Sequence, residues 1–76
     1  MRAYVFIKVQ PLSVRKVVRK IAEIEGVKVA HACWGAPDVI AQAEAHDEEA
    51  FQELVIGQIQ AIEGVVETDT HVVLED

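Results

Sequence analysis

The chain lacks the residues that build covalent or membrane-bound frameworks. It holds a single cysteine, Cys33, so no disulfide can form within it, as is typical of proteins in a reducing, intracellular setting. No stretch reaches the ~20 consecutive apolar residues of a membrane-spanning helix. The N-terminus has no charged segment followed by a long apolar run and a cleavage site. These absences predict a soluble, cytoplasmic protein with no membrane partner.

Positive charge is missing from most of the chain. All seven Lys and Arg lie in residues 1–28 beside two acids, which leaves that part at +5, whereas residues 29–76 carry eleven acids and bring the total to −6. A negative chain is poorly suited to hold nucleic acid on its own. The asymmetry either draws the two parts together, joins the basic face of one copy to the acidic face of another, or reflects two solvated helix faces.

Recognisable catalytic and metal-binding motifs are also lacking. His31 and Cys33 share one face of a predicted strand, but no CxxC or HxxxH spacing accompanies them, so we expect no metal site. The four glycines, at 26, 35, 57 and 64, are too scattered for a phosphate-binding loop. Ser13 is placed as a helix cap rather than as a nucleophile. We therefore expect neither catalytic residues nor a cofactor.

The chain does contain an internal repeat. The tetrapeptide Ile-Glu-Gly-Val occupies residues 24–27 and again 62–65, with a spacing of 38. Each copy follows apolar residues at helical spacing, each glycine sits where a helix C′ residue belongs, and each final valine opens a strand. The repeat therefore indicates two β-α-β halves.

The local patterns predict six elements in the order β-α-β-β-α-β. Strands are expected over residues 3–9, 27–34, 38–45 and 65–74, with one helix from a Ser13 cap to about Glu25 and a second from an Asp47 cap to the glycine at 64. Right-handed crossovers place both helices on one face of a four-stranded antiparallel sheet. This is the ferredoxin-like arrangement of the α+β class.

The other face of such a sheet is bare in a single chain. The strands hold more apolar residues than one face can use, namely Val5, Ile7, Val27, Val29, Ile40, Val72 and Val73. We therefore predict that a second copy of the chain covers the bare face. Gly57, inside the second helix at a cost of ~1 kcal/mol relative to Ala, and the neighbouring Ile56 mark either a tolerated surface position or a further subunit contact.

Two polar stretches form a candidate binding site. The turn Gly35-Ala36-Pro37-Asp38 joins the second and third strands, and backbone amides left outside the ladder can receive a carboxylate. The Asp38 side chain is suited to an ammonium group, and Thr68 and Thr70 add hydroxyls from the last strand. Together they suit the zwitterionic end of an amino acid, although turn formation and strand pairing explain both stretches equally well.

The whole chain resembles the effector domain, also called the RAM domain, of the Lrp/AsnC family of transcriptional regulators. The resemblance rests on the opening strand AYVFIKV, the two glycine joints, the turn at 35–38, and the Thr-x-Thr block of Thr68 and Thr70. It implies one domain over residues 1–76 that dimerises through its sheet and assembles into rings of eight or ten chains. It also implies that an amino acid binds between dimers, with Gly35 and Asp38, Ala36 and Pro37 between them, and the two threonines as ligand-binding residues.

Two positions depart from the family pattern and bear on which ligand is accepted: Pro37 replaces the usual aromatic residue, and Trp34 replaces a small polar one. No residues here form the helix-turn-helix of full regulators. We therefore expect a stand-alone effector domain that senses amino acids for metabolic regulation, does not bind DNA directly, and is able to assemble with a full-length regulator. The alternatives are a dimeric α+β-barrel monooxygenase, which needs a cavity between sheet and helices, and a structural assembly subunit.

Overall fold

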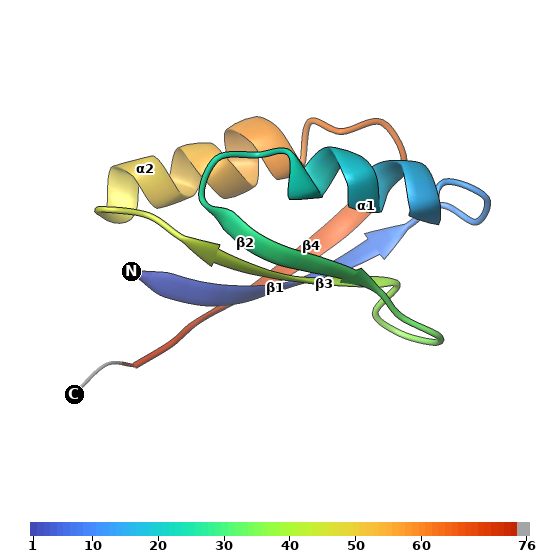
Figure 1. Cartoon of the computed structure of the whole chain (residues 1–76), viewed down its shortest axis with the longest axis horizontal. Coiled ribbons are helices and arrows are strands. Elements are labelled where there is room, and N and C mark those ends of the chain that lie inside the picture. Colours follow the sequence, from blue (N-terminus) through green and yellow to red (C-terminus); the bar gives the residue numbers. More distant parts are fainter. Residues whose placement is uncertain (75–76) are drawn as a thin grey trace.

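Two β-α-β halves build one four-stranded antiparallel sheet. In the computed structural model, which describes residues 1–74, the elements are β1 (Arg2–Val9), α1 (Val14–Ala22), β2 (Val27–Ala32), β3 (Val39–Glu44), α2 (Glu48–Gln52), the π-helix η1 (Glu53–Ile59) and β4 (Val65–Val72). The strand order is β2-β3-β1-β4, and the helices cover one face (Figure 1). This architecture confirms the predicted ferredoxin-like fold.

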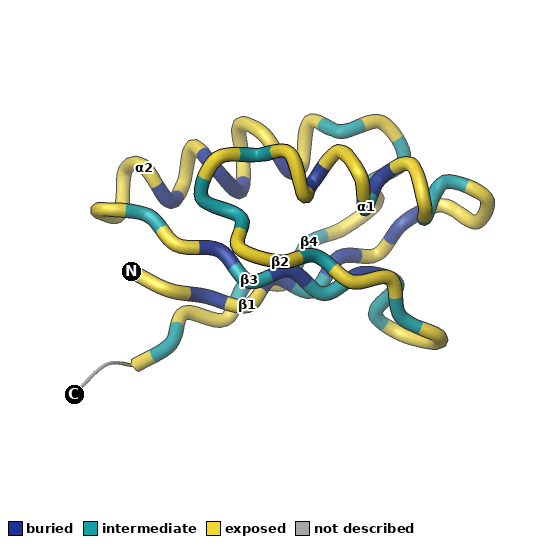
Figure 2. The backbone as a smooth tube through the Cα atoms, in the orientation of Figure 1, coloured by how far each residue is buried: buried dark blue, intermediate teal, exposed yellow. Residues whose placement is uncertain are grey.

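Alternation along the central strand β1 decides which residues form the core. Ala3, Val5, Ile7 and Val9 are buried, whereas the residues between them are exposed or half-buried. Because successive side chains of a strand point to opposite faces, the four buried residues face the helices. The helices add Val17, Ile21, Phe51, Leu54, Val55 and Ile59 to this single apolar layer. Figure 2 shows buried positions of the helices on the side that faces the sheet.

The opposite face of the sheet is uncovered and chemically mixed. It carries Tyr4, Phe6 and Lys8 of β1, and the strand registers place Ile40, Gln42, Asp69 and His71 beside them. The expected surplus of aliphatic residues is smaller here than predicted, since Val5 and Ile7 both face the helices. Aromatic and polar side chains take their place on the bare face.

The repeated tetrapeptide forms a β-turn rather than a helix cap. Helix α1 ends at Ala22, earlier than predicted, and the Val27 amide donates to the Ile24 carbonyl at 3.1 Å. Gly26 lies third in this four-residue turn with φ of +100°, the position at which a type II turn requires a positive φ. The second copy repeats the geometry: the Val65 amide donates to Ile62 at 3.1 Å, and φ of Gly64 is +103°.

Each of these turns holds the other half of the molecule. The Gly26 carbonyl accepts from the amide of Glu44, the last residue of β3, at 2.8 Å. The Gly64 carbonyl accepts from the amide of Gln10, which directly follows β1, also at 2.8 Å. The turn between the helix and the second strand of one half is thus bonded to the end of the first strand of the other half.

The second helix departs from an α-helix after one turn. Asp47 caps it as predicted, because its Oδ1 accepts from the Ala50 amide at 2.8 Å. Residues 53–59 then form a π-helix, whose last turn is closed by a bond of 2.9 Å from the Gln60 amide to the Val55 carbonyl. Gly57 lies in this wide segment.

Some predicted ends and caps differ from the structure. Ser13 stands at the N-cap of α1, but its side chain makes no capping hydrogen bond, because its backbone is helical (φ −104°, ψ −3°) rather than extended. The strands β2, β3 and β4 are each two residues shorter than predicted: β2 and β4 at their C-terminal ends, and β3 by one residue at each end. Residues 33–38 consequently belong to the turn between β2 and β3.

Candidate functional site

The turn between β2 and β3 presents two backbone amides to solvent. It is closed by the Cys33 amide, which donates to the Asp38 carbonyl at 2.8 Å, and Gly35 has φ of +115°. Within residues 1–74 no hydrogen bond occupies the amides of Gly35 and Ala36, both exposed. Pro37 has no N–H, and the Asp38 amide is used within the fold, so the amides of Gly35 and Ala36 are the available donors for an anion within residues 35–38.

Asp38 fastens this turn to the central strand. Its amide donates to the Ile7 carbonyl at 3.1 Å, and its Oδ2 accepts from the Val9 amide at 2.8 Å. The side chain is half-buried. Oδ1 has no hydrogen-bond partner among residues 1–74. One carboxylate oxygen therefore holds the fold, and the other remains available for a cation.

Thr68 and Thr70 lie on the helix side of the edge strand β4. They pair with Ile7 and Val5, whose side chains are buried under the helices, and both are half-buried. The Thr68 Oγ1 accepts from Nε2 of Gln60 at 2.8 Å. The sequence does not indicate Gln60, because a lone glutamine after a helix carries no sign of a partner eight residues further along.

One chain brings the turn and the threonines to the same end of the sheet without enclosing a space between them. Asp38 lies on the β3 side of Ile7 and Thr68 on the β4 side. Neighbouring strands are ~4.8 Å apart, so the two backbones are about 10 Å from each other. None of the six predicted site residues lines either of two hollows that lie at the surface of residues 1–74.

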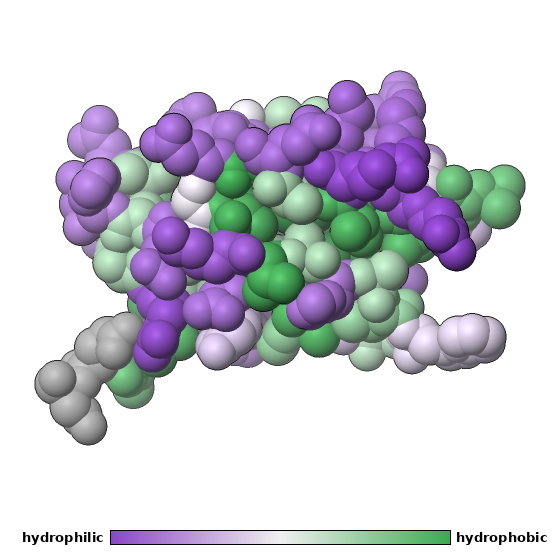
Figure 3. Space-filling model, in the orientation of Figure 1, coloured by the Kyte–Doolittle hydropathy of each residue, from purple (hydrophilic) through white to green (hydrophobic). Residues whose placement is uncertain are grey.

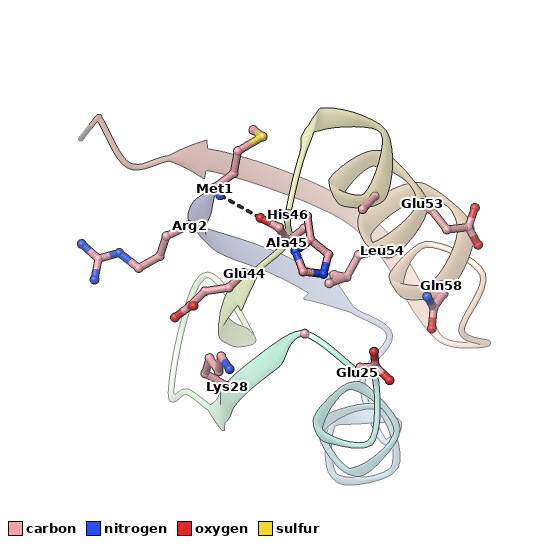
Figure 4. A pocket seen from close by; sticks show the side chains of 12 residues that line it. Met1, Arg2, Glu25, Lys28, Glu44, Ala45, His46, Glu53, Leu54 and Gln58 are labelled. Atoms are coloured by element: carbon pink, nitrogen blue, oxygen red, sulfur yellow. Dashed lines mark hydrogen bonds between the residues drawn. The ribbon is translucent and has the colours of Figure 1, made fainter. Parts of the chain in front are cut away.

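The larger hollow, of about 840 Å³, lies at the other end of the sheet. It is open and lined by charges of both signs, including Arg2, Lys28, Glu25 and Glu53, around Leu54. Figure 4 shows its strand side closed by the N-terminal amine, which donates to the Ala45 carbonyl at 2.7 Å. Sequence analysis singled out none of these residues as a site.

The bare sheet face carries the aromatic cluster of the molecule. The rings of Phe6 and His71 lie 4.9 Å apart at 46°, and Nε2 of His71 is 3.1 Å from Oδ2 of Asp69. His31 and Cys33, the pair weighed as metal ligands, are joined only by a contact of 3.8 Å from the thiol to the His31 carbonyl. Over residues 1–74 no group of three His, Cys, Asp or Glu side chains is arranged to hold a metal ion.

No helix in the described part of the chain is both long enough and apolar enough to span a bilayer.

Sequence comparison identifies the relatives of this chain. The model of the Lrp/AsnC ligand binding domain family matches residues 2–76. An uncharacterized HTH-type transcriptional regulator of Pyrococcus furiosus is 30% identical over 70 residues, which cover 92% of this chain and 47% of the relative. The chain thus spans about half the length of the curated relatives that it matches.

Solved structures share the fold. TTHA0845 from Thermus thermophilus superposes with a TM-score of 0.92 at 27% identity, covering 99% of this chain and 94% of that one. AsnC of Escherichia coli gives 0.90 at 20% identity, covering 99% and 51%. The transcriptional regulator NMB0573 of Neisseria meningitidis, solved as a complex with L-Met, gives 0.85 at 21% identity, covering 99% and 50%. The last two likenesses show the fold alone, but the family match spans nearly the whole sequence, and this chain belongs to the Lrp/AsnC ligand binding domain family.

Proposed function

We propose that this domain senses a free amino acid that binds between copies of the chain, and that it regulates amino-acid metabolism through its state of assembly. The proposal rests chiefly on the turn at residues 35–38, which combines two available amides with a carboxylate oxygen. The amides of Gly35 and Ala36 suit the ligand's carboxylate, and Oδ1 of Asp38 suits its ammonium group. Family membership supports a regulatory binding role, and the Neisseria regulator with the same fold was solved as a complex with an amino acid, L-Met.

The site is completed in this proposal by another copy of the chain. Trp34, beside the turn, is fully exposed, and a second subunit would cover it. Thr68 and Thr70 of one chain are too far from its own turn to share a small ligand, so they are assigned to a neighbouring copy's ligand. The bare sheet face forms the first dimer through Tyr4, Phe6 and Ile40, and dimers join into a ring of eight or ten chains.

The regulatory output in this proposal is indirect. A net charge of −6 opposes contact with DNA by this domain alone. The proposed protein partner is a full-length regulator of the same family, because its effector domain would present an equivalent sheet face. The proposed location of both proteins is the cytoplasm. The enzyme alternative is less well supported: the space between sheet and helices is filled by fully buried Val17, Ile21 and Ile59.

Calorimetric titration with the twenty amino acids tests the ligand. The wild-type domain should bind a subset. Asp38→Asn should abolish binding but keep the fold, because the amide oxygen of Asn still accepts from Val9. Asp38→Ala should lose binding and also ~1–3 kcal/mol of stability, since the Val9 amide loses its acceptor.

A structural assembly subunit is the second candidate, and the bond from the Val9 amide to Asp38 favours it, because this bond gives Asp38 a role without any ligand. No heat of binding for any of the twenty amino acids would support this second candidate over the first. Binding left unchanged by Asp38→Asn would instead show that Asp38 does not hold the ligand.

A further inference from the structure

Two helix surfaces of opposite charge remain unused by the proposed function. The basic stripe consists of Arg15, Lys16, Arg19 and Lys20 on α1, all exposed. Residues at i, i+1, i+4 and i+5 share one side of a helix. The acidic hollow lies on α2 and η1, has a volume of about 690 Å³, and is lined by Asp47, Glu49, Ala50, Glu53, Ile56 and Gly57, among others. Figure 3 shows polar side chains gathered over the outer side of this helix layer.

The hollow is lined by apolar as well as acidic residues. Ile56 is 59% exposed although it is a large aliphatic residue in a helix. Gly57 beside it has no side chain, and the Glu53 carboxylate leans over it: a Cβ built on Gly57 would lie 2.5 Å from Oε2 of Glu53. An aliphatic stem that ends in a positive charge is the chemistry that fits such a place, as Lys and Arg side chains provide.

The charges of the basic stripe are largely not neutralised by ion pairs with acidic side chains of the same chain, as far as residues 1–74 show. Lys16 reaches Glu63 at 3.7 Å, but both side chains are more than half exposed, so this pair contributes little. Within residues 1–74 no ion pair joins Arg15, Arg19 or Lys20 to an acidic side chain. Most of the positive charge of the stripe is therefore available to pair with acidic side chains of a partner.

We propose that the basic stripe of one copy docks into the acidic hollow of another copy, and that this contact joins the dimers made by the sheet face. Every copy carries both surfaces in one helix layer. The stripe of each copy can therefore dock into the hollow of the other copy at the same time. The inference rests on the self-association in the proposed function but not on its amino-acid effector. In this inference, the interface between dimers is held by opposite charges that surround Ile56.

The sign of the salt effect separates this contact from an apolar one. Each copy has a net charge of −6, so copies repel one another at long range. Salt screens this repulsion, and an apolar interface would therefore strengthen as salt rises. A contact between the stripe and the hollow must weaken instead. By sedimentation velocity we expect assemblies larger than dimers at about 50 mM NaCl and dimers at about 500 mM, where the Debye length falls from ~14 Å to ~4 Å.

Charge reversals provide the decisive test. Arg19→Glu and Glu53→Lys should each weaken the joining of dimers at least about tenfold, since like charges then face each other. Lys28→Glu and Glu25→Lys make the same changes in net charge at exposed positions outside both surfaces and should leave assembly close to wild type. Mixing Arg19→Glu with Glu53→Lys should restore large assemblies containing both chains, which native mass spectrometry resolves by mass.

Restored assembly in the mixture would support the docking, because no folding defect is repaired by mixing two defective chains. Wild-type dimers at low salt, strengthening with salt, or no mixed assemblies from folded variants would each overturn it. The sheet dimer is judged separately: Arg19→Glu should stop at dimers, and if it gave monomers the proposed sheet contact would be wrong instead. The amino-acid proposal is judged separately, by titration of the wild-type domain.

Discussion

Alanine at three of the glycines should give three different stabilities, because the structure surrounds each glycine differently. At Gly26 an added Cβ would lie 2.6 Å from the Leu54 side chain and 2.8 Å from the Glu44 carbonyl oxygen, which is backbone and cannot rotate away. A positive φ costs a residue with a Cβ about 1–3 kcal/mol. Overpacking adds about 1–3 kcal/mol. Gly26→Ala should therefore lose about 2–6 kcal/mol.

The other two glycines separate these causes. At Gly35 φ is +115°, but nothing lies within 4 Å of an added Cβ, so only the backbone strain of about 1–3 kcal/mol applies. At Gly57 φ is ordinary, and the atom in the way is the mobile end of Glu53. Gly57→Ala should therefore gain up to ~1 kcal/mol from helix propensity, less the cost of moving Glu53.

Urea unfolding at one fixed protein concentration measures the series, because assembly adds to the apparent stability. For a domain of this length each kcal/mol also moves Tm by roughly 4–8 °C. The expected order of stability is Gly57→Ala, then wild type, then Gly35→Ala, then Gly26→Ala. If Gly26→Ala lost no more stability than Gly35→Ala, the close contact with the Glu44 carbonyl would add no cost to the substitution, and the reasoning would fail.

Three further predictions concern the helix caps, the hydrogen bond from Gln60 to Thr68, and the bare sheet face. Asp47→Ala should cost ~1 kcal/mol through loss of the bond to Ala50, whereas Ser13→Ala should be almost neutral in the same urea titration, since Ser13 makes no capping bond; equal losses would contradict the structure. Thr68→Val should cost ~0.5–1 kcal/mol, because it removes the acceptor of Gln60, and Gln60→Ala in the Thr68→Val background should then add little in a double-mutant cycle. Phe6→Glu should give a folded monomer by sedimentation with an unchanged far-UV spectrum, because it places a charge in the centre of the bare face; an intact dimer would exclude this face as the interface.

The internal repeat was enough to predict the fold, but not the local geometry at its joints. The spacing of 38 residues indicates two β-α-β halves and therefore the order of the elements. The glycine in each copy also indicates a position of positive φ, at Gly26 and at Gly64. Whether such a glycine ends a helix or sits in a β-turn depends on where the helix stops. Here the Ile24 amide bonds to the Ile21 carbonyl, three residues back, so α1 has already ended.

The candidate site shows a similar limit. The sequence identifies the turn at residues 35–38 and the two threonines, and alternation predicts that the threonines share a face. It does not say which face, because that depends on the register of β4 against β1. Nor does it show that Val9, 29 residues away, uses one oxygen of Asp38. Nor does the sequence indicate the π-helix, since its wide turn is defined by the backbone bond from Gln60 to Val55 rather than by side chains.

The paired bonds from Gly26 to Glu44 and from Gly64 to Gln10 have a consequence for cooperativity. In each half, the carbonyl of the glycine turn between the helix and the second strand accepts a hydrogen bond from the other half, so each half needs the other to complete its backbone hydrogen bonds. A break in the exposed turn at Gly35 should leave two fragments that fold only when combined. The intact chain should unfold in one step, with the amides of Gln10 and Glu44 exchanging hydrogen together.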